Sequence, residues 1–513
     1  MADYVYMMET RLTPDQQKGV ALVAEVARQG EMNVYLTGGA MRDMISGASI
    51  RDIDLTVQGN PLKLQKELEK AGAVVQWVDD DTRTLYLLLP GNVRAELGMA
   101  RQERYGKPGK PPEISQGTII DDLRRRDFTV NAMALSLNEG SRGLLLDPAN
   151  GVADIENKVI RVLHNYSFLE EPSRLIRATR FTARFHWNLE ERTQARYNAA
   201  KEGNYIEHIS DRQIGYEIEQ LAYEDDPLHI MRTLEKEEWL RVLHPRWGVS
   251  KADTAGLADL LKTREHMQSL GYGAIDTGPP VMYMLTGRLS GADITAIQKL
   301  VPNKGFVQSW KHLEDDAKEL AKRLGGKEAA TPSMAWKLLS ATRAETILFL
   351  DSTARSQSVA QKIKNFLTKW RQVKDKIPLP EMAELHITPE IPQYNELTEQ
   401  IFFLLLDGKL RSRTETLKFL KPYAPPPPAP PPPPPAKRGR GAKAAEAPSA
   451  VAVEAGKKGK KDKGAAAAAQ AAAPPAAPAP AARKHEPRKA KRPAKPAKSR
   501  RPSKPAKKPK KKR

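Results

Sequence analysis

The proline run from Pro425 to Pro435 limits what this chain of 513 residues can fold into. Ten of its eleven residues are proline, so it lacks the backbone N–H groups that a helix or sheet needs and should form a stiff polyproline II spacer. Beyond it, alanine, lysine, arginine and proline alternate, and no aromatic residue follows Tyr423. Because such a sequence cannot bury a core, we expect residues 424–513 to be a disordered tail.

The charge of the chain divides at the same boundary. The whole chain has a formal net charge of +21, but residues 424–513 contain 26 Lys and Arg against 4 Asp and Glu, so residues 1–423 are close to neutral. A flexible basic segment binds phosphate backbones without reading their sequence. The tail is therefore predicted to bind nucleic acid non-specifically, with a solubilising appendage as the alternative.

The sequence contains no cysteine, which excludes disulfide frameworks, thiolate zinc sites and cysteine nucleophiles. The first ten residues include charged side chains, and no stretch of about 18 apolar residues occurs anywhere in the chain. We therefore expect a cytoplasmic protein that does not enter a membrane.

Periodicity in residues 1–423 predicts an α/β part followed by a helical part. A helix is expected over 12–29, where Thr13 suits the N-cap and Pro14 suits the first turn. Alternation with period two predicts strands at 33–37, 52–57, 74–78, 83–89 and 93–99, with short helices at 41–45 and 60–71. This order indicates a mixed β-sheet. From about residue 157 strand signals are few, and helices are predicted at 173–185, 211–222 and 227–234.

The clearest chemical motif is Gly38-Gly39-Ala40-Met41-Arg42-Asp43, followed nine residues later by Asp52-Ile53-Asp54. Residues i and i+2 of a strand point to one face, so Asp52 and Asp54 present two carboxylates side by side. A cation must separate them, and Mg²⁺ is commonly held by one or two carboxylates together with water and phosphate oxygens. The glycines let backbone N–H groups approach a phosphate at a helix N-terminus. Each motif alone is more often a plain turn or a solvated strand, but together they indicate a nucleoside triphosphate site with a metal.

The order and spacing of these motifs resemble the nucleotidyltransferase superfamily, in particular the class II branch of tRNA nucleotidyltransferases and bacterial poly(A) polymerases. Residues 122–132 are similar to the second motif of that family, whose Arg and Asp contact the nucleotide, and residues 170–181 resemble its fourth, an amino-acid template for the base. The resemblance covers residues 31–245. It implies an α/β nucleotidyltransferase head with a mixed β-sheet, followed by all-α neck and body domains and the disordered basic tail. The expected boundaries are a head at 1–156, a neck at 157–245, a body at 246–423 and the tail at 424–513.

The resemblance also implies roles for individual residues. Asp52 and Asp54 would be catalytic and hold Mg²⁺, and Glu96, on a neighbouring strand, is the candidate third catalytic carboxylate. The nucleotide would be bound by Gly38, Gly39, Arg42, Asp43, Arg126, Asp127, Asn131, Glu171, Arg174, Arg177 and Arg180. Within that set, Gly39 and Arg42 would hold the triphosphate. Arg126 and Asp127 would hold the ribose. Glu171, Arg174 and Arg177 would hold the base and its surroundings.

Glu171 and Arg174 are the candidate base readers. A carboxylate accepts from an exocyclic amine while a guanidinium donates to ring acceptors, which suits cytosine or adenine better than uracil or guanine. The family usually has Asp where this chain has Glu171, so the base preference could be relaxed. An ion pair on a helix surface is the alternative interpretation.

The implied activity is template-independent addition of C or A, from CTP and ATP, to the 3′ end of tRNA, as a CCA tRNA nucleotidyltransferase or an enzyme that adds only the terminal A. Residues 164–168 resemble the tRNA enzymes, particularly the A-adding branch, whereas the basic tail resembles poly(A) polymerases that act on other RNA 3′ ends. A non-enzymatic RNA-binding scaffold is the third interpretation. It is disfavoured because a scaffold has no need to pair Asp52 with Asp54.

Overall fold

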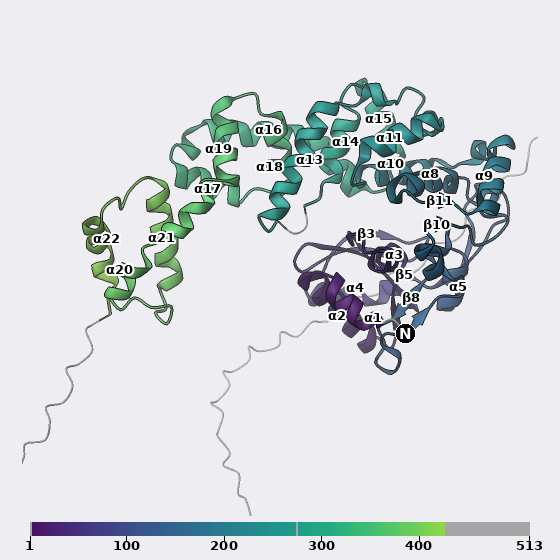
Figure 1. Cartoon of the computed structure of the whole chain (residues 1–513), viewed down its shortest axis with the longest axis horizontal. Coiled ribbons are helices and arrows are strands. Elements are labelled where there is room, and N and C mark those ends of the chain that lie inside the picture. The colour runs from purple at the N-terminus through teal and green to yellow at the C-terminus, as the bar shows by residue number, and fades with distance from the viewer. Residues whose placement is uncertain (1–2, 273–274, 426–513) are drawn as a thin grey trace, which may run out of the picture. The chain divides into compact units, whose positions relative to one another are not determined.

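A seven-stranded sheet forms the centre of the first part of the chain in the computed structural model, which describes residues 3–272 and 275–425 (Figure 1). The strand order is β3-β4-β5-β2-β1-β8-β9, in which β2 and β5 run parallel and the other neighbours run antiparallel. The predicted mixed sheet is therefore confirmed. Its strands are β1 (Asn33–Thr37), β2 (Ile53–Gln58), β3 (Val74–Asp79), β4 (Thr84–Leu89), β5 (Val93–Met99), β8 (Ala134–Ser136) and β9 (Leu145–Leu146).

Smaller β-structures and six helices complete this part. Strands β6 (Arg101–Arg104) and β7 (Glu113–Gln116) form a separate hairpin, and β10 (Val159–Ile160) pairs with β11 (Asn188–Leu189). The helices are α1 (Tyr4–Arg11), α2 (Pro14–Gln29), α3 (Gly38–Ser46), α4 (Gln65–Lys70), α5 (Ile119–Arg124) and α6 (Gly151–Glu156). Helix α2 starts as predicted, because Thr13 and Gln16 cap each other's backbone N–H groups.

Side chains on β2 and β5 alternate between a covered face and an open face of the sheet. Ile53, Leu55 and Leu97 are buried on the covered face, against which α2 packs. The residues between them, Asp54 and Glu96, point to the opposite face. The apolar half of the alternation thus builds the core, and the polar half is left free for chemistry.

The rest of the described chain is helical. Helices α8 and α10 begin and end at the predicted residues, and α11 continues two residues beyond its predicted end. The helices are α7 (Ser167–Glu170), α8 (Ser173–Phe185), α9 (Glu191–Glu202), α10 (Asp211–Ala222), α11 (Pro227–Lys236), α12 (Trp239–Leu243), α13 (Thr254–Ser269), α14 (Gly278–Leu285), α15 (Gly291–Leu300), α16 (Lys304–Gly325), α17 (Pro332–Ser340), α18 (Ala344–Thr353), α19 (Gln357–Leu367), α20 (Leu379–Glu384), α21 (Tyr394–Leu406) and α22 (Arg413–Leu420).

One hydrophobic cluster runs through the described residues from Met8 to Leu406, and a second, around Met382 and Ile401, holds the last helices together. The described residues all belong to one compact unit, so the boundaries near residues 156 and 245 stay predictions. The expected disordered tail lies outside the described residues except for Ala424 and Pro425. Among the residues that the structure describes, no helix combines the length and the apolar character required to cross a bilayer.

The structure departs from the predicted elements at two places in the motif region. Helix α3 begins directly at Gly38 rather than near Met41, and β2 begins at Ile53, so Asp52 lies in the bend before the strand. Strands β6 to β9 and helix α1 were not predicted. They are short or rich in charged residues, and their stability comes from pairing with distant segments rather than from a local pattern.

Gly215→Ala should destabilise the protein, because a Cβ at Gly215 in α10 would overlap the backbone carbonyl of Leu300 at the end of α15. Overpacking of this kind costs about 1–3 kcal/mol. We expect a melting temperature lower by several degrees.

Gly291→Ala is the matched control, since Gly291 is also helical and no atom lies within 4 Å of its Cβ position. Its melting temperature should stay level or rise, because alanine favours helix. Equal melting temperatures for the two variants would contradict the close packing of α10 against α15.

Candidate active site

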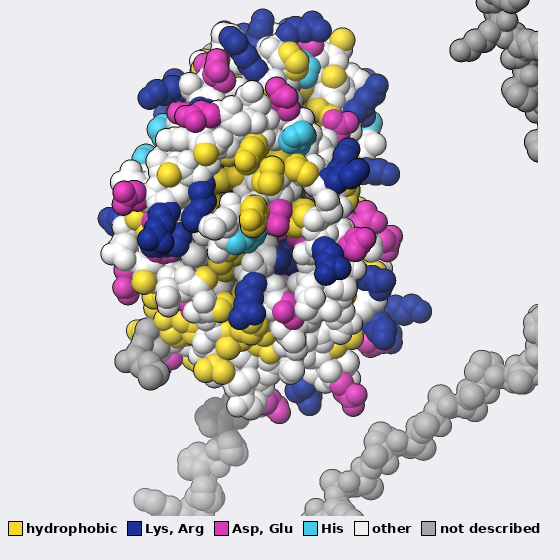
Figure 2. Space-filling view, turned by 90° about the vertical axis from the view of Figure 1, so that its right-hand side faces the viewer, with side chains coloured by type: hydrophobic (Ala, Val, Ile, Leu, Met, Phe, Trp, Pro, Cys, Tyr) yellow, Lys and Arg dark blue, Asp and Glu magenta, His cyan; other side chains and the backbone are white. Residues whose placement is uncertain are grey.

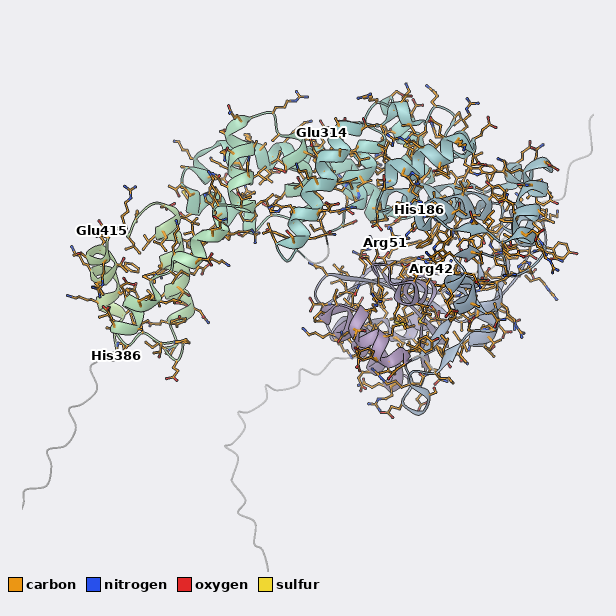
Figure 3. All side chains as sticks on the ribbon, in the orientation of Figure 1. Arg42, Arg51, His186, Glu314, His386 and Glu415 are labelled. Atoms are coloured by element: carbon orange, nitrogen blue, oxygen red, sulfur yellow. The ribbon has the colours of Figure 1, made fainter. Side chains whose placement is uncertain are left out.

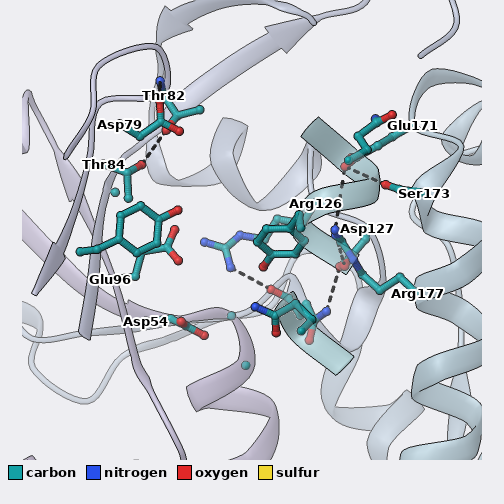
Figure 4. Close-up of a pocket in the computed structure, with 18 of the residues that line it drawn as sticks. Asp54, Asp79, Thr82, Thr84, Glu96, Arg126, Asp127, Glu171, Ser173 and Arg177 are labelled. Carbon is teal, nitrogen blue, oxygen red and sulfur yellow. Dashed lines mark hydrogen bonds and ion pairs between the residues drawn. The ribbon is translucent and has the colours of Figure 1, made fainter. Parts of the chain in front are cut away.

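A cavity of about 960 Å³ lies between the open face of the sheet and helices α8 and α10 (Figure 4). Asp54 and Glu96 line it on the sheet side, and Glu171 and Arg177 line it on the other side. Eleven residues were predicted to bind the nucleotide: Gly38, Gly39, Arg42, Asp43, Arg126, Asp127, Asn131, Glu171, Arg174, Arg177 and Arg180.

Every one of those eleven residues lines the cavity, and so do Asp52, Asp54 and Glu96. The structure therefore brings together all the residues that the sequence singled out, from segments as far apart as α3 and α8.

The sheet wall of the cavity carries two adjacent carboxylates. Asp54 on β2 and Glu96 on β5 are direct neighbours across the parallel strand pair, so their side chains leave the same face. Burial, together with the nearby Asp52, raises the pKa of the Asp54 carboxyl to about 6. Burial and Asp54 raise the pKa of Glu96 to about 7. Two partly buried acids beside a third carboxylate, Asp52, form a site that a cation would stabilise.

Asp52 forms an ion pair with an arginine, whereas its spacing from Asp54 predicts a cation shared by the two carboxylates. Its Oδ1 lies 3.3 Å from Nε of Arg94, whose guanidinium is 4.1 Å from the ring centroid of Tyr223 and 3.8 Å from Asp276. Arg94 is two residues before Glu96 on β5, so strand alternation places it on the same open face. Asp52 would have to exchange this arginine for a metal in order to act as a ligand.

The carboxylate oxygens suit Mg²⁺, which prefers hard oxygen ligands. Among the residues described here, no group of three or more His, Cys, Asp or Glu side chains is arranged to hold a metal ion. The fit therefore rests on the partly buried pair Asp54 and Glu96, which place oxygen ligands side by side on the open face of the sheet.

Gly38 and Gly39 bring the backbone of α3 close to this pair. Gly38 has a positive φ of 62°, and a Cβ there would lie 2.9 Å from both Asp54 Oδ2 and Arg126 Nη1. At Gly39 a Cβ would lie 3.1 Å from the same Asp54 oxygen. The N–H of Ala40 donates to that oxygen over 3.2 Å. A side chain at either glycine would therefore crowd Asp54, and the positive φ of Gly38 favours glycine there. The N-terminus of α3 opens onto the carboxylates.

Arg126 is held between the acidic pair and the segment that follows α5. Its guanidinium donates to Asp122 over 2.8 Å, to Thr56 Oγ1 over 3.2 Å and to the carbonyl of Asn131 over 3.2 Å. Asp122 also binds Arg125 over 2.6 Å and is fully buried. The apolar residues that follow Arg126 are buried, because Phe128, Val130 and Leu135 have no exposed surface. Buried arginines need such anionic partners.

Asp127 and Asn131 form a second small network. Asp127 Oδ1 accepts from the Asn131 side chain over 2.9 Å, and its Oδ2 accepts from Arg177 over 3.1 Å. Although burial opposes it, Arg177 and Asn131 hold the pKa of Asp127 below its usual value. Asp127 therefore stays ionised to a lower pH than Asp54 on the opposite wall.

Helix α8 presents a stripe of arginines, because its members lie three or four residues apart: Arg174, Arg177, Arg180 and Arg184. We call this set the α8 arginine stripe. Glu217 of α10 is fully buried between two of its members, 3.0 Å from Arg177 and 3.1 Å from Arg180. Glu224 binds Arg180 over 2.8 Å and lies 3.8 Å from Arg184. These ion pairs tie the helical wall of the cavity together.

The predicted base readers form an ion pair at the start of α8. Glu171 lies just before the helix, and its Oε2 accepts from Arg174 Nε over 3.0 Å. Arg174 is 2 % exposed and also donates to Ser167 Oγ and to the carbonyl of Arg125. Its orientation is therefore fixed, and the Glu171 side chain is the more accessible of the two.

Arg42, which is labelled in Figure 3, and its neighbour Asp43 support the site from α3. Arg42 makes two hydrogen bonds to its neighbour Asp43 and one of 2.6 Å to Asn131 Oδ1. Its guanidinium also lies 4.8 Å from the ring centroid of Phe185 on α8. Both side chains are buried, so their geometry is that of residues that join α3 to α8.

The cavity is also lined by residues that were not singled out from the sequence. Among them are Trp77, Tyr86, Arg94 and Tyr216. The position of Arg94, two residues from Glu96, was a signal that strand alternation could have supplied. Tyr216 lies next to Glu217 on α10, and the guanidinium of Arg177 is 5.2 Å from its ring centroid.

The chain is similar to a known protein family and to several known proteins. Residues 34–161 match the family described as the poly A polymerase head domain. An A-adding tRNA nucleotidyltransferase of Halalkalibacterium halodurans is 35 % identical over 232 residues, which are 45 % of this chain and 54 % of that protein. A CC-adding tRNA nucleotidyltransferase of Deinococcus radiodurans is 41 % identical over 154 residues, 30 % of this chain and 41 % of that protein. The chain spans about half the length of such curated relatives.

A solved structure of a Thermotoga maritima CCA-adding enzyme complexed with tRNA is also similar. It is 26 % identical, covers 82 % of this chain and 98 % of its own, and has a TM-score of 0.41.

Glu96→Gln should raise the melting temperature at pH 8 in metal-free buffer. The pKa of Glu96 rises from an ordinary 4.5 to about 7 in the fold, so wild-type stability falls as the pH rises through this range. The uncharged amide avoids that loss. Calorimetry should show the largest difference at pH 8 and none near pH 4.

Glu113→Gln, at an exposed position of β7, is the matched control and should leave the melting temperature unchanged at every pH. A Glu96→Gln melting temperature equal to that of wild type at pH 8 would contradict a buried, uncompensated carboxylate.

Proposed function

The chain belongs to the class II tRNA nucleotidyltransferase and poly(A) polymerase head family, and we propose that it adds C or A nucleotides to the 3′ end of tRNA without a template. The substrates would be CTP and ATP, with Mg²⁺ as cofactor. The A-adding and CC-adding relatives support this class of reaction, and the product of this chain would be the CCA end or its terminal A.

One observation supports the proposal most strongly. The acidic pair Asp54 and Glu96 and the ion pair of Glu171 and Arg174 line opposite walls of one cavity (Figure 4). A nucleoside triphosphate between these walls would place its phosphates at the acids and its base at the ion pair. This is the arrangement that nucleotide transfer with selection of the base requires.

On the sheet wall, Asp54 and Glu96, with Asp52 once it leaves Arg94, would hold Mg²⁺. The bound ion would supply neutralisation of charge on the triphosphate and a lower pKa for the 3′-hydroxyl of the RNA. The N–H groups of Gly38 and Gly39 would bind phosphate oxygens at the start of α3. No protein nucleophile is needed, because the residues act by positioning and by charge.

On the helical wall, Glu171 would accept from the exocyclic amine of cytosine or adenine, and Arg174 would donate to the ring. Arg174 is held in place by Ser167 and the backbone of Arg125, so the pair is oriented before the nucleotide arrives. Asp127 and Arg126 would contact the ribose and phosphates, as the resemblance implies. Arg180 and Asp43, which bind other side chains, would act as positioning residues.

The RNA would be held by local contacts rather than by the net charge of the folded part. Residues 1–423 are close to neutral. On the face shown in Figure 2, Lys and Arg side chains are interspersed with Asp and Glu and form no single basic field. The basic tail would add non-specific affinity for phosphate backbones.

Incorporation of labelled CTP, ATP and UTP tests the proposal, with tRNA lacking its 3′ end compared with a generic oligoribonucleotide. Addition of C or A to tRNA alone would support it. Long A tracts on both RNAs would identify a poly(A) polymerase instead. No incorporation on either RNA would contradict the proposed activity and favour the RNA-binding scaffold.

Asp54→Ala and Asp52→Ala should each lower nucleotide transfer at least about a hundredfold, because each removes a carboxylate from the site where charge is neutralised. RNA affinity should change little. Single-turnover incorporation into tRNA measures the loss, and Asp80→Ala, an exposed acid outside the cavity, is the control. Retention of more than a few per cent of wild-type activity by both variants would overturn the mechanism.

Glu171→Ala and Arg174→Ala should damage nucleotide selection more than the chemical step. Loss of a paired base contact costs about 1–3 kcal/mol of discrimination. Misincorporation of UTP and GTP relative to CTP and ATP should rise in competition assays. Glu170→Ala, which removes a neighbouring acid that contacts His164 instead, should keep wild-type selectivity. Unchanged selectivity in both test variants would contradict base reading and indicate that Glu171 and Arg174 form a structural ion pair.

A further inference from the structure

Two aromatic side chains stack on each other on the open face of the sheet. The ring centroids of Trp77 on β3 and Tyr86 on β4 are 4.6 Å apart, and the rings are 18° from parallel. Both residues line the cavity and both are partly exposed. The apolar core of the sheet is on its other face, so the pair is not part of that core.

A β-bulge places Trp77 in this position. Val75 pairs with Leu87, but the register then shifts and Trp77, rather than Gln76, pairs with Tyr86. Regular alternation would put Trp77 on the same face as Val75, the covered face to which Leu87 belongs. The extra residue therefore turns the indole to the open face. Bulges next to functional sites commonly redirect a side chain in this way.

The stacked pair is in register with the acidic pair. Tyr86 pairs with Glu96 across β4 and β5, and Glu96 pairs with Asp54 across β5 and β2. Trp77, Tyr86, Glu96 and Asp54 thus form one row across four adjacent strands. Neighbouring residues in such a row lie about 5 Å apart. The ring of Tyr86 is therefore about the length of one nucleotide from the acids.

We propose that Trp77 and Tyr86 form a stacking platform for the base of the RNA's 3′-terminal nucleotide, with its 3′-hydroxyl at Asp54 and Glu96. The inference rests on the proposed function, and it assigns the RNA end rather than the incoming nucleotide. The base of the latter belongs to Glu171 and Arg174 on the opposite wall.

The chemistry of the reaction favours stacking at this position. The last base of the RNA changes with each nucleotide added, so contacts that read hydrogen-bonding edges would reject one of the successive ends. An aromatic face accepts every base, because every base has a π-face. Tyr216 of α10 lines the same cavity and adds aromatic surface on the helical side.

The test uses tRNA that carries 2-aminopurine as its 3′-terminal base, bound to full-length protein without nucleotide. Stacking on the platform should quench the fluorescence of this base. Trp77→Ala and Tyr86→Ala should each restore most of the fluorescence and raise the KM for tRNA about ten- to a hundredfold. The KM for ATP and the kcat at saturating tRNA should stay within about twofold.

Three controls separate stacking from a structural effect. Tyr86→Phe keeps the ring and should keep the quench. Leu88→Ala changes the same face of β4 two residues away, outside the cavity, and should behave as wild type. Melting temperatures identify any variant that fails to fold, and Trp77, on an edge strand, then provides the decisive measurement.

The outcomes distinguish this inference from the proposed function. Normal addition to tRNA, with wild-type quench and KM in both alanine variants, would overturn the platform and leave the function standing. Wild-type protein that adds nothing to tRNA would overturn both. Quench that is lost in both alanine variants and retained by Tyr86→Phe would establish the platform.

Discussion

The α8 arginine stripe is the interaction on which the cavity depends. Its guanidinium groups can be buried only because carboxylates from other elements meet them, above all Glu217 and Glu224 of the helical wall. Removal of one partner from such a network leaves an uncompensated buried charge, which costs about 3–5 kcal/mol. Asp127, which binds Arg177, extends the network to the segment that follows α5. The two walls of the cavity are therefore held by charge pairs rather than by apolar packing alone.

The acids on the two walls of the cavity have pKa values that are shifted in opposite directions. On the helical wall the arginines keep Asp127 ionised, with its pKa below the usual value. On the sheet wall Asp54 and Glu96 have raised pKa values, because burial and repulsion from a neighbouring carboxylate, Asp52 for Asp54 and Asp54 for Glu96, outweigh the nearby cations. A metal ion with a triphosphate would complete this arrangement, since it brings positive charge to the acids and negative charge to the start of α3.

Much of the site could be predicted from local pattern. The motifs and the family resemblance singled out Asp54, Glu96 and three arginines of α8, Arg174, Arg177 and Arg180, and all of them line the cavity. The partners of these residues could not be predicted in the same way. Asp52 binds Arg94 and not a neighbour in its own motif, because a bend turns it out of β2 before the strand begins.

By itself, the sequence determined the apolar faces of the sheet and helices, the glycines that α3 requires, and the near-neutral charge of residues 1–423, because each depends on residue type and spacing. Only the tertiary structure decided which distant groups meet. The bulge that turns Trp77 beside Tyr86 depends on the register of β3 against β4. The burial of Glu217 between Arg177 and Arg180 depends on how α10 packs against α8. Register and packing are set by the free energy of the whole fold, which no local pattern records.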